Sequence, residues 1–218
     1  MDIKYWNSFA HSYDQDVLEI IQEDSKSVLK KEIMALAKKE YIAADMGCGR
    51  GSLLPLLSSK FKQVYALDYA KDLINQAQIR HSYNNISYIQ RDLTRRRSFP
   101  FKVDVTFCLN ALIHPSNNIR QAIARSIYRA TKIKGYGVFV VPSMESILNT
   151  YQMMLKHDER LGKIRQTALK GMERLYANEV ISTIDGIVNI GGELTKCFMQ
   201  QELDKFLTDV GYAVESIK

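Results

Sequence analysis

The sequence has no apolar run of about 18 or more residues, so no helix that crosses a membrane is expected. Its N-terminus, Met1–Asn7, lacks a cationic region followed by an apolar one, which predicts that it is not a secretory signal. Cysteines are few: Cys48, Cys108 and Cys197 are widely spaced and fit no zinc or disulfide pattern. These absences predict a cytoplasmic protein with reduced thiols and no metal site.

Acidic residues are fewer than basic ones, 24 against 30, which gives a formal net charge of +6. Such an excess can favour anionic substrates, membrane surfaces or nucleic acid. The basic residues are mostly scattered, and the densest group joins Arg91 to Arg95, Arg96 and Arg97. No RNA-binding motif lies near this group, so a solvated loop is favoured over a nucleic-acid interface.

Short apolar runs alternate with segments of helical periodicity between residues 41 and 141. Runs of this kind predict strands, and apolar residues spaced three or four apart predict helices. The expected strands are 41–45, 64–68, 86–90, 103–109 and 136–141, and the expected helices are 52–60, 71–80 and 119–130, with Gly135 as the stop after the last helix. The alternation predicts an α/β fold: a doubly wound, mainly parallel sheet with helices on both faces.

The two flanks of this region follow a different pattern. Residues 1–40 are expected to be helical, and residues 143–193 to be a largely helical insertion in a single domain that spans 1–218. Segment 184–190 is a candidate strand, and helix 200–210 and strand 212–217 close the chain. Side chains of the insertion could form an adaptable apolar roof over a substrate, or could simply pack together; they are Met144, Tyr151, Met153, Met154 and Met172.

A glycine-rich turn, Asp45-Met46-Gly47-Cys48-Gly49-Arg50-Gly51, follows the first expected strand. Glycines permit positive φ and close backbone approach, and the helix N-terminus that follows offers free N–H groups. The dinucleotide pattern G-x-G-x-x-G would place its third glycine at Ser52 rather than Gly51. No Lys-Ser/Thr pair follows either, so the turn predicts a polar ligand other than a dinucleotide or a nucleoside triphosphate.

The segment Ala44–Gly51 resembles the first motif of class I S-adenosylmethionine-dependent methyltransferases. In that family, the turn cradles the methionine end of the cofactor, and the acid in the position of Asp45 interacts with the amino group of that end. The resemblance implies S-adenosylmethionine as the cofactor and S-adenosylhomocysteine as its product. The residues of the turn that it implies in binding are Gly47, Cys48, Gly49 and Gly51.

Two acids at later strand ends fit the same resemblance. Asp68, followed by Tyr69, ends the second strand, and a carboxylate there can accept both ribose hydroxyls, although a dinucleotide enzyme would carry the same acid. Asp92 lies where the family receives the adenine amino group, with the N–H of Leu93 next to the ring. The alternative for Asp92 is a helix-capping or loop acid.

The stretch 108–114 resembles the family segment that lines the methyl-transfer site. Asn110 and Ala111 are expected in its wall, whereas Cys108 is expected in the core. His114 is the candidate base for an acceptor that arrives protonated, and an ordinary packed or exposed histidine is the alternative.

The N-terminal segment, residues 5–14, resembles the opening of many small-molecule methyltransferases, including quinone-methylating types. There an aromatic segment that ends in Tyr-Asp folds over the cofactor. Tyr13 is therefore the expected cofactor contact in an N-terminal lid, residues 1–40, and an aromatic helix that merely covers the sheet is the alternative.

The resemblance covers residues 43–141 with the terminal helix and strand, and it implies a Rossmann-like methyltransferase fold. The chain departs from the family after strand 212–217, where the final antiparallel strand is missing. Segment 184–190, a partner subunit such as a second copy in a homodimer, or truncation could each account for the open sheet edge.

The ordered motifs predict methyl transfer to a small-molecule acceptor by in-line displacement, in which alignment of the reacting atoms supplies much of the rate. Two alternatives stay open. An RNA or protein methyltransferase fits the basic balance, but residues 110–113 carry no Asn/Asp-Pro-Pro-Tyr/Phe motif. A non-catalytic cofactor-binding subunit fits the missing strand. The identity of the acceptor is not indicated by the sequence.

Overall fold

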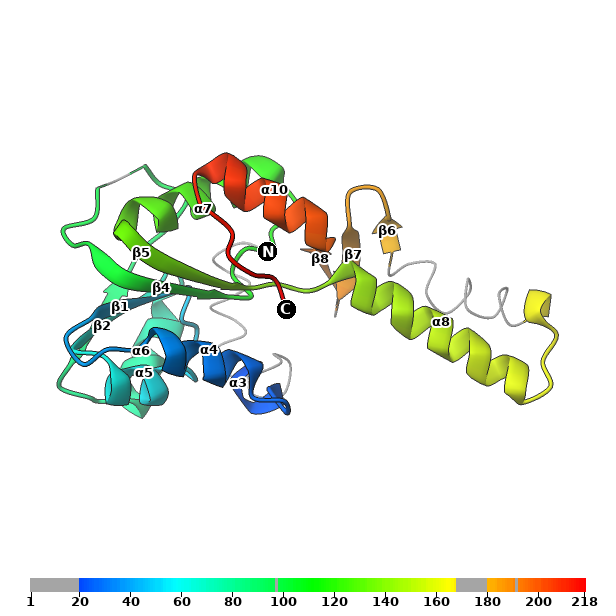
Figure 1. Ribbon diagram of the computed structural model, residues 1–218, viewed down its shortest axis with the longest axis horizontal. Coiled ribbons are helices and arrows are strands. Elements are labelled where there is room, and N and C mark those ends of the chain that lie inside the picture. The colour runs from blue at the N-terminus through cyan, green and yellow to red at the C-terminus, as the bar shows by residue number, and fades with distance from the viewer. Residues whose placement is uncertain (1–19, 97, 168–179, 191) are drawn as a thin grey trace. The chain divides into compact units, whose positions relative to one another are not determined.

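The computed structural model describes residues 20–96, 98–167, 180–190 and 192–218 (Figure 1). The chain divides into two compact units: the first comprises Met1–Leu112, Ser116–Val140 and Lys218, and the second comprises Ile113–Pro115 and Val141–Ile217. Within the described ranges, no helix is both long and apolar enough to span a membrane. The predicted organisation, a single domain with an insertion at about 143–193, stays a prediction.

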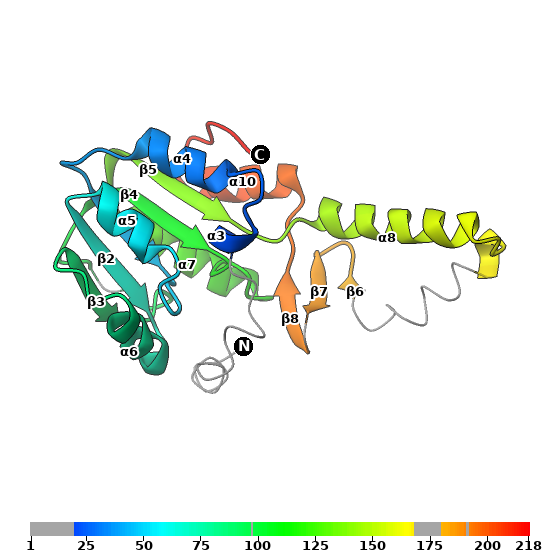
Figure 2. The same ribbon diagram turned by 90° about the horizontal axis from the view of Figure 1, so that it is seen from below.

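A five-stranded sheet in the order β3-β2-β1-β4-β5 forms the centre of the first unit, and all its pairings are parallel. Helices α4, α5 and α6 lie on one face of the sheet and α7 lies on the other (Figures 1 and 2). The strands are β1 (Ile42–Met46), β2 (Gln63–Asp68), β3 (Ile86–Gln90), β4 (Val103–Leu109) and β5 (Thr131–Val140), and the helices are α3 (Ile20–Glu23), α4 (Val28–Leu36), α5 (Leu54–Lys60), α6 (Lys71–Arg80) and α7 (Asn117–Ala130). The predicted doubly wound α/β fold is confirmed.

The second unit holds a long helix and a small antiparallel sheet in the order β6-β7-β8. Its elements are α8 (Met144–Arg160), β6 (Val180–Ser182), β7 (Ile187–Ile190), β8 (Glu193–Lys196) and α10 (Gln200–Val210). Helix α8 is capped by Ser143, whose hydroxyl accepts the N–H of Ser146. Its buried residues Met144 and Leu155 lie on one stripe, and Met144 packs with Val188 of β7 and Cys197. Met153, in contrast, is 64% exposed, so it is not part of this buried stripe. Met172, also predicted in the apolar roof, lies outside the described residues.

Two sequence-based expectations about strands are wrong. Segment 212–217 forms no strand: helix α10 ends at Val210 with Gly211 as its cap, and the residues that follow have no regular structure. Their alternating apolar pattern is typical of a strand, but no neighbouring strand pairs with them. Residues 187–190 do form a strand, yet β7 pairs with β6 and β8 in the small sheet and does not extend the large one.

The junction between α7 and β5 also differs from the expectation. The helix ends at Ala130, because Thr131 adopts an extended conformation, and Gly135 is not the helix stop. Strand β5 therefore begins at Thr131 rather than at Tyr136. Its register against β4 pairs Thr131 with Val103 and Tyr136 with Val105, so residues 132–135 bulge opposite the single residue Asp104.

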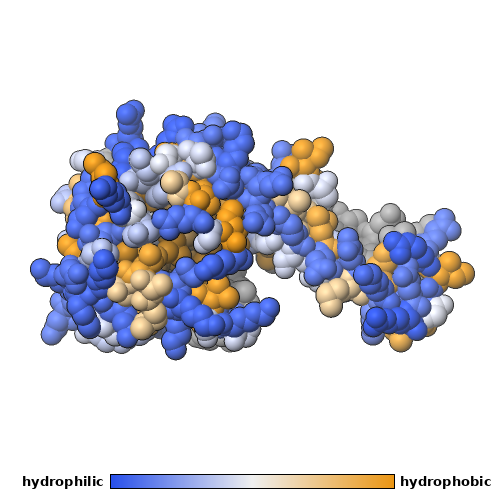
Figure 3. All heavy atoms as spheres, in the orientation of Figure 1, coloured by the Kyte–Doolittle hydropathy of each residue, from blue (hydrophilic) through white to orange (hydrophobic). Residues whose placement is uncertain are grey.

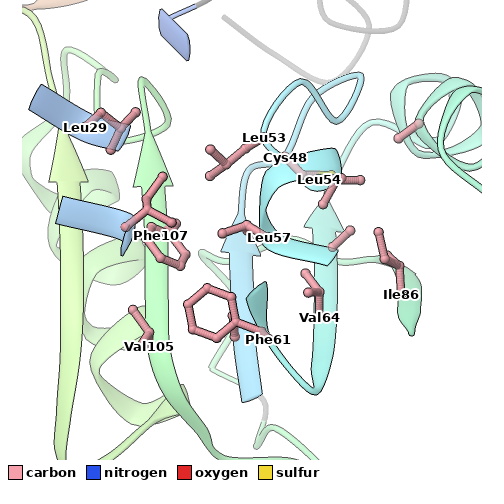
Figure 4. Packing of buried hydrophobic residues seen from close by; sticks show 14 of the residues in the cluster. Leu29, Cys48, Leu53, Leu54, Leu57, Phe61, Val64, Ile86, Val105 and Phe107 are labelled. Atoms are coloured by element: carbon pink, nitrogen blue, oxygen red, sulfur yellow. The ribbon is translucent and has the colours of Figure 1, made fainter. Parts of the chain in front are cut away.

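The main hydrophobic core lies between the sheet and the helices α4, α5 and α6 (Figure 4). Phe107 of β4 is fully buried there and meets Phe61 edge to face, with ring centroids 5.9 Å apart. Ile33 of α4 and Leu57 of α5 are also fully buried in this core. Strand β4 is buried along most of its length, as expected for a parallel strand that is covered on both faces.

On the opposite face, the connection from β3 to β4 has no helix among its described residues. An aromatic stack lies there instead: Phe101 stacks on Tyr65 of β2 with ring centroids 3.9 Å apart, and Phe99 packs on Phe101. The guanidinium of Arg91 lies 3.8 Å above the ring of Phe99. The stack supplies apolar cover for this part of the sheet.

Truncation of Phe107 tests the importance of the core around β4. We expect Phe107→Ala to lower the free energy of unfolding by about 3–5 kcal/mol, because it leaves a cavity beside Phe61. Urea denaturation followed by circular dichroism measures the effect. Ile133→Ala is the control, since Ile133 is 96% exposed, and it should change stability by no more than about 0.5 kcal/mol. Equal losses in the two variants would contradict the proposed core.

Candidate functional site

The glycine-rich turn leaves β1 at the carboxyl end of the sheet and crosses towards β2. The N–H groups of Gly47 and Cys48 both donate to the carbonyl oxygen of Leu67, at 2.7 and 2.8 Å. The φ angles of Gly47, Gly49 and Gly51 are 88°, 54° and 85°, in the left-handed region that favours glycine. The alternate glycines of this motif are therefore required by the backbone path of the turn.

The turn also lies against the segment that follows β4. A Cβ atom added at Gly47 would lie 2.5 Å from the Cβ atom of Ala111, so no larger residue fits at position 47 without a shift. Asn110 has a φ of 51°, and its N–H donates to the carbonyl oxygen of Val140 at the end of β5. Asn110 and Ala111, predicted as part of the site wall, thus lie beside the predicted turn.

Asp68, at the end of β2, connects two turns through its buried carboxylate. One oxygen accepts the N–H of Gly49 at 3.0 Å, and the other accepts the N–H of Ala70 at 2.9 Å. The side chain is only 7% exposed, and burial raises the pKa of Asp68, while the backbone hydrogen bonds oppose this shift. The carboxylate therefore fixes the glycine turn relative to the start of α6.

Asp45 is buried at the end of β1 and is 3% exposed. Burial first, and then repulsion from Asp68, raises the pKa of Asp45 from its ordinary value of 3.8 to about 7. A second buried carboxyl group so close to Asp68 gives this edge of the sheet a strong preference for a cationic or hydrogen-bond-donating ligand.

Cys48 and Cys108 are buried beside these acids, and the pKa values of both thiols are raised, mainly by burial. Such thiols are protonated at neutral pH, so they are poor nucleophiles. Cys48 thus contributes its backbone to the turn rather than reactive sulfur.

Asp92 follows β3 and organises its own loop. Its Oδ1 atom accepts the N–H and the hydroxyl of Thr94 at 2.9 and 2.6 Å, and its Oδ2 atom lies 3.3 Å from Nε of Arg95. This is the alternative role, a loop acid, that the sequence left open. A carboxylate offers about four acceptor positions, so Asp92 retains capacity for a further donor. Leu93 is 8% exposed next to it, and Tyr69, which follows β2, is half-buried.

For two predicted site residues, the structure gives no placement relative to this group. His114 is half-buried and belongs to the second unit, within the segment Ile113–Pro115. Tyr13 lies outside the described residues. The structure also adds Arg50, a cation only 9% exposed within the glycine turn, which the sequence patterns did not single out. Its position between two glycines of the motif was the available signal.

The residues at this edge of the sheet lie in a region that matches a known protein family. A family model described as a methyltransferase domain matches residues 43–135, which span β1 to the bulge of β5. Residues 43–135 are thus similar to a methyltransferase domain. The turn, Asp68, Asp92 and the Asn110 segment all lie within the matched region.

Two curated relatives that are similar to this chain are named as O-methyltransferases. Malonyl-[acyl-carrier protein] O-methyltransferase of Bacillus cereus is 25% identical over 180 residues, which cover 81% of this chain and 64% of that protein. The chain thus spans less than two thirds of that relative. Malonyl-[acyl-carrier protein] O-methyltransferase 2 of Coxiella burnetii is 23% identical over 214 residues, which cover 93% of this chain and 84% of that protein.

Solved structures of methyltransferases share the fold. The DhpI-SAM-HEP complex matches with a TM-score of 0.66 and 19% identity, over 96% of this chain and 86% of that chain. This likeness supports the Rossmann-like methyltransferase fold.

Substitution of Gly47 tests the close approach of the turn to Ala111. We expect Gly47→Ala to lower the affinity for S-adenosylhomocysteine at least about tenfold, because the new methyl group displaces the turn or the Ala111 wall. Calorimetric titration measures the affinity, and thermal unfolding measures the stability of the same sample.

A matched glycine separates the steric effect from backbone strain. Gly162 has a φ of 83°, but nothing lies within 4 Å of its added Cβ atom. Gly162→Ala should therefore cost only about 1–2 kcal/mol of backbone strain and leave affinity unchanged. Adding Ala111→Gly to Gly47→Ala should recover part of the lost affinity. If Gly162→Ala weakens binding as much as Gly47→Ala does, the close contact is not the cause.

The raised pKa of Asp45 predicts a pH dependence of stability in the cofactor-free protein. The folded state holds a proton on Asp45 that the unfolded state releases near pH 4, so this contribution is full below about pH 4 and is lost as the pH rises to about 7. Within this window the slope reaches at most about 1.4 kcal/mol per pH unit. Urea denaturation from pH 4 to pH 8 should show the slope as a difference between the wild-type protein and Asp45→Asn. Parallel curves for the two proteins would contradict the raised pKa.

Proposed function

We propose that this protein transfers the methyl group of S-adenosylmethionine to a small-molecule acceptor by in-line displacement. The family match over residues 43–135 supports methyl transfer, and the solved neighbours whose names include SAM or SAH support this cofactor. The observation that carries the proposal is the pair of buried carboxyl groups, Asp45 and Asp68, at neighbouring strand ends.

The two acids offer what the polar parts of the cofactor require. An ammonium group beside Asp45 would offset the burial and the repulsion that raise the pKa of that carboxyl group. The methionine end of S-adenosylmethionine carries such a group. The carboxylate of Asp68 already accepts two backbone N–H groups, and its remaining lone pairs suit the ribose hydroxyls.

The other proposed contacts surround this pair. The turn would hold the methionine end, while Asn110 and Ala111 would form the wall near the transferred methyl group. The remaining cofactor contacts that we propose are Gly47, Cys48, Gly49, Gly51, Tyr69, Asp92, Leu93 and, from the N-terminal segment, Tyr13. S-adenosylmethionine supplies an electrophilic methyl group on a sulfonium, so the residues of the chain need only bind, align and exclude water.

A carboxylate is the acceptor group to examine first. Both curated relatives are named for O-methylation of a malonyl group carried by acyl carrier protein. A carboxylate is already deprotonated at neutral pH, so its methylation requires no general base. For such an acceptor we assign His114 an orienting role, and a catalytic base at His114 is needed only for an acceptor that arrives protonated.

Calorimetric titration with S-adenosylhomocysteine tests the proposed cofactor site. We expect Asp68→Asn to weaken binding about 10- to 100-fold, because it removes the charged acceptor of the ribose hydroxyls. Asp72→Asn is the matched control, since Asp72 is an exposed acid in the first turn of α6. It should leave the affinity within about twofold, which corresponds to less than 1 kcal/mol. Absence of binding by the folded wild-type protein would overturn the proposal.

The acceptor class requires a separate assay. Methyl transfer from labelled cofactor is measured with malonyl thioesters, with other small carboxylic acids, with RNA and with protein. Transfer to a small carboxylate supports the proposal, whereas transfer to RNA or protein alone overturns it. A protein that binds cofactor but methylates none of these acceptors would favour the alternative of a non-catalytic subunit.

A further inference from the structure

The edge of the sheet opposite the cofactor-binding edge is strongly basic. All five strands are parallel, so the residues that enter them gather at this one edge. The entering segments 38–41, 60–62, 82–85, 102–104 and 129–136 hold eight basic and two acidic residues, an excess equal to the net charge of +6 of the whole chain. We name these eight residues the basic edge; they are Lys38, Lys39, Lys60, Lys62, Lys102, Arg129, Lys132 and Lys134.

Hydrogen bonds join the entering segments to one another. Lys39 donates to the carbonyl oxygen of Ser59, and the N–H of Lys62 donates to that of Tyr41. Lys102 donates to the carbonyl oxygen of Arg129. These contacts join the entering segments of β1 and β2 and those of β4 and β5, and β1 also pairs with β4, so the basic edge is one surface although its residues are scattered in the sequence.

Of the two acids of this edge, Glu40 is exposed, whereas Asp104 is engaged by neighbouring groups. Asp104 accepts the N–H of Ile42 at 2.8 Å and forms an ion pair with Lys132 at 2.9 Å. Its side chain is 18% exposed. The pKa of Lys38 is raised chiefly by its hydrogen bond with Tyr41, which keeps the ammonium charged. The basic edge therefore presents a net positive surface to solvent.

An exposed apolar residue projects from this surface. Ile133 lies between Lys132 and Lys134 on the bulge of β5, and it is 96% exposed. The bulge is tightly closed, because a Cβ atom at Gly135 would lie 2.7 Å from the carbonyl oxygen of Asp104. Two tyrosines close to the bulge in the sequence, Tyr128 and Tyr136, are 43% and 38% exposed. A fixed bulge thus displays one isoleucine flanked by two lysines.

The position of the basic edge separates it from methyl transfer. The glycine turn, Asp45 and Asp68 lie at the carboxyl ends of the strands, whereas the basic edge lies at their amino ends. A strand of five or six residues spans about 17–20 Å. A ligand that is bound at the basic edge is therefore not positioned to receive the methyl group, and this surface serves attachment.

We propose that the basic edge binds the surface of an anionic lipid bilayer, with Ile133 inserted between the headgroups. Seven of the eight residues are lysines, whose point charges suit a diffuse anionic surface, whereas phosphate recognition in nucleic acids favours the bidentate geometry of arginine. Lysines around an exposed apolar residue and tyrosines are typical of peripheral contact with the membrane interface.

Sedimentation with vesicles tests the surface in the full-length chain. The vesicles contain phosphatidylcholine alone or with about 30% phosphatidylserine, at about 0.1 M salt. We expect binding only to the anionic vesicles, and a strong loss of binding at about 0.5 M salt. The double variant Lys62→Glu with Lys134→Glu should weaken binding about tenfold or more. Ile133→Asp should also weaken binding, although it leaves every lysine of the basic edge in place.

A matched charge reversal tests whether location or total charge matters. Lys26→Glu with Lys30→Glu makes the same change in net charge at exposed residues around the start of α4, away from the basic edge. This control should bind within about twofold of the wild-type protein. Circular dichroism verifies that each variant is folded. Equal losses in both double variants, or no binding of the wild-type protein to anionic vesicles, would overturn the proposal. Tighter binding to duplex RNA or DNA than to vesicles would also overturn it, if the double variant Lys62→Glu with Lys134→Glu loses its nucleic-acid binding to the same extent.

Discussion

Two backbone turns meet at the carboxylate of Asp68, and the geometry of the cofactor edge depends on this meeting. One turn follows β1 and donates through Gly49, and the other follows β2 and donates through Ala70. Because the carboxylate is buried, it must have hydrogen-bond partners, and these two N–H groups supply them. The same group that the ribose would use thus already fixes the distance between the two loops. Loss of Asp68 would therefore alter both the ligand contact and the frame that holds the glycine turn.

The sequence predicted most of the first unit, because its elements follow local rules. The strands β3 and β4 and the helix α6 begin and end where apolar periodicity places them. The second unit was harder to predict, because β6 and β8 are only three and four residues long and depend on pairing with β7. The strand expected at 212–217 had the right alternation but no partner, and alternation alone does not create a ladder of hydrogen bonds.

The features of the candidate site also divide into those that the sequence predicted and those that it did not. Motif spacing predicted that the glycine turn, Asp68 and the Ala111 segment lie at one edge, because the carboxyl ends of parallel strands converge. The contact between Gly47 and Ala111 was not predictable, since it joins residues more than sixty positions apart by close packing. The basic edge was missed for a related reason: its lysines are scattered along the chain, and only the parallel sheet brings them together.

Strand β1 lies at the centre of the sheet, so its pairing with both neighbours is completed only late in the synthesis of this region. On one side β1 pairs with β2, which follows it closely, but on the other it pairs with β4, which the ribosome completes only at Leu109. Even the first N–H of β1, that of Ile42, is accepted by Asp104 of β4. A nascent chain that ends before β4 would carry the whole glycine turn on a strand with one open, apolar edge. Such an intermediate is prone to wrong pairing, so chaperone protection would matter most while residues 46–109 emerge.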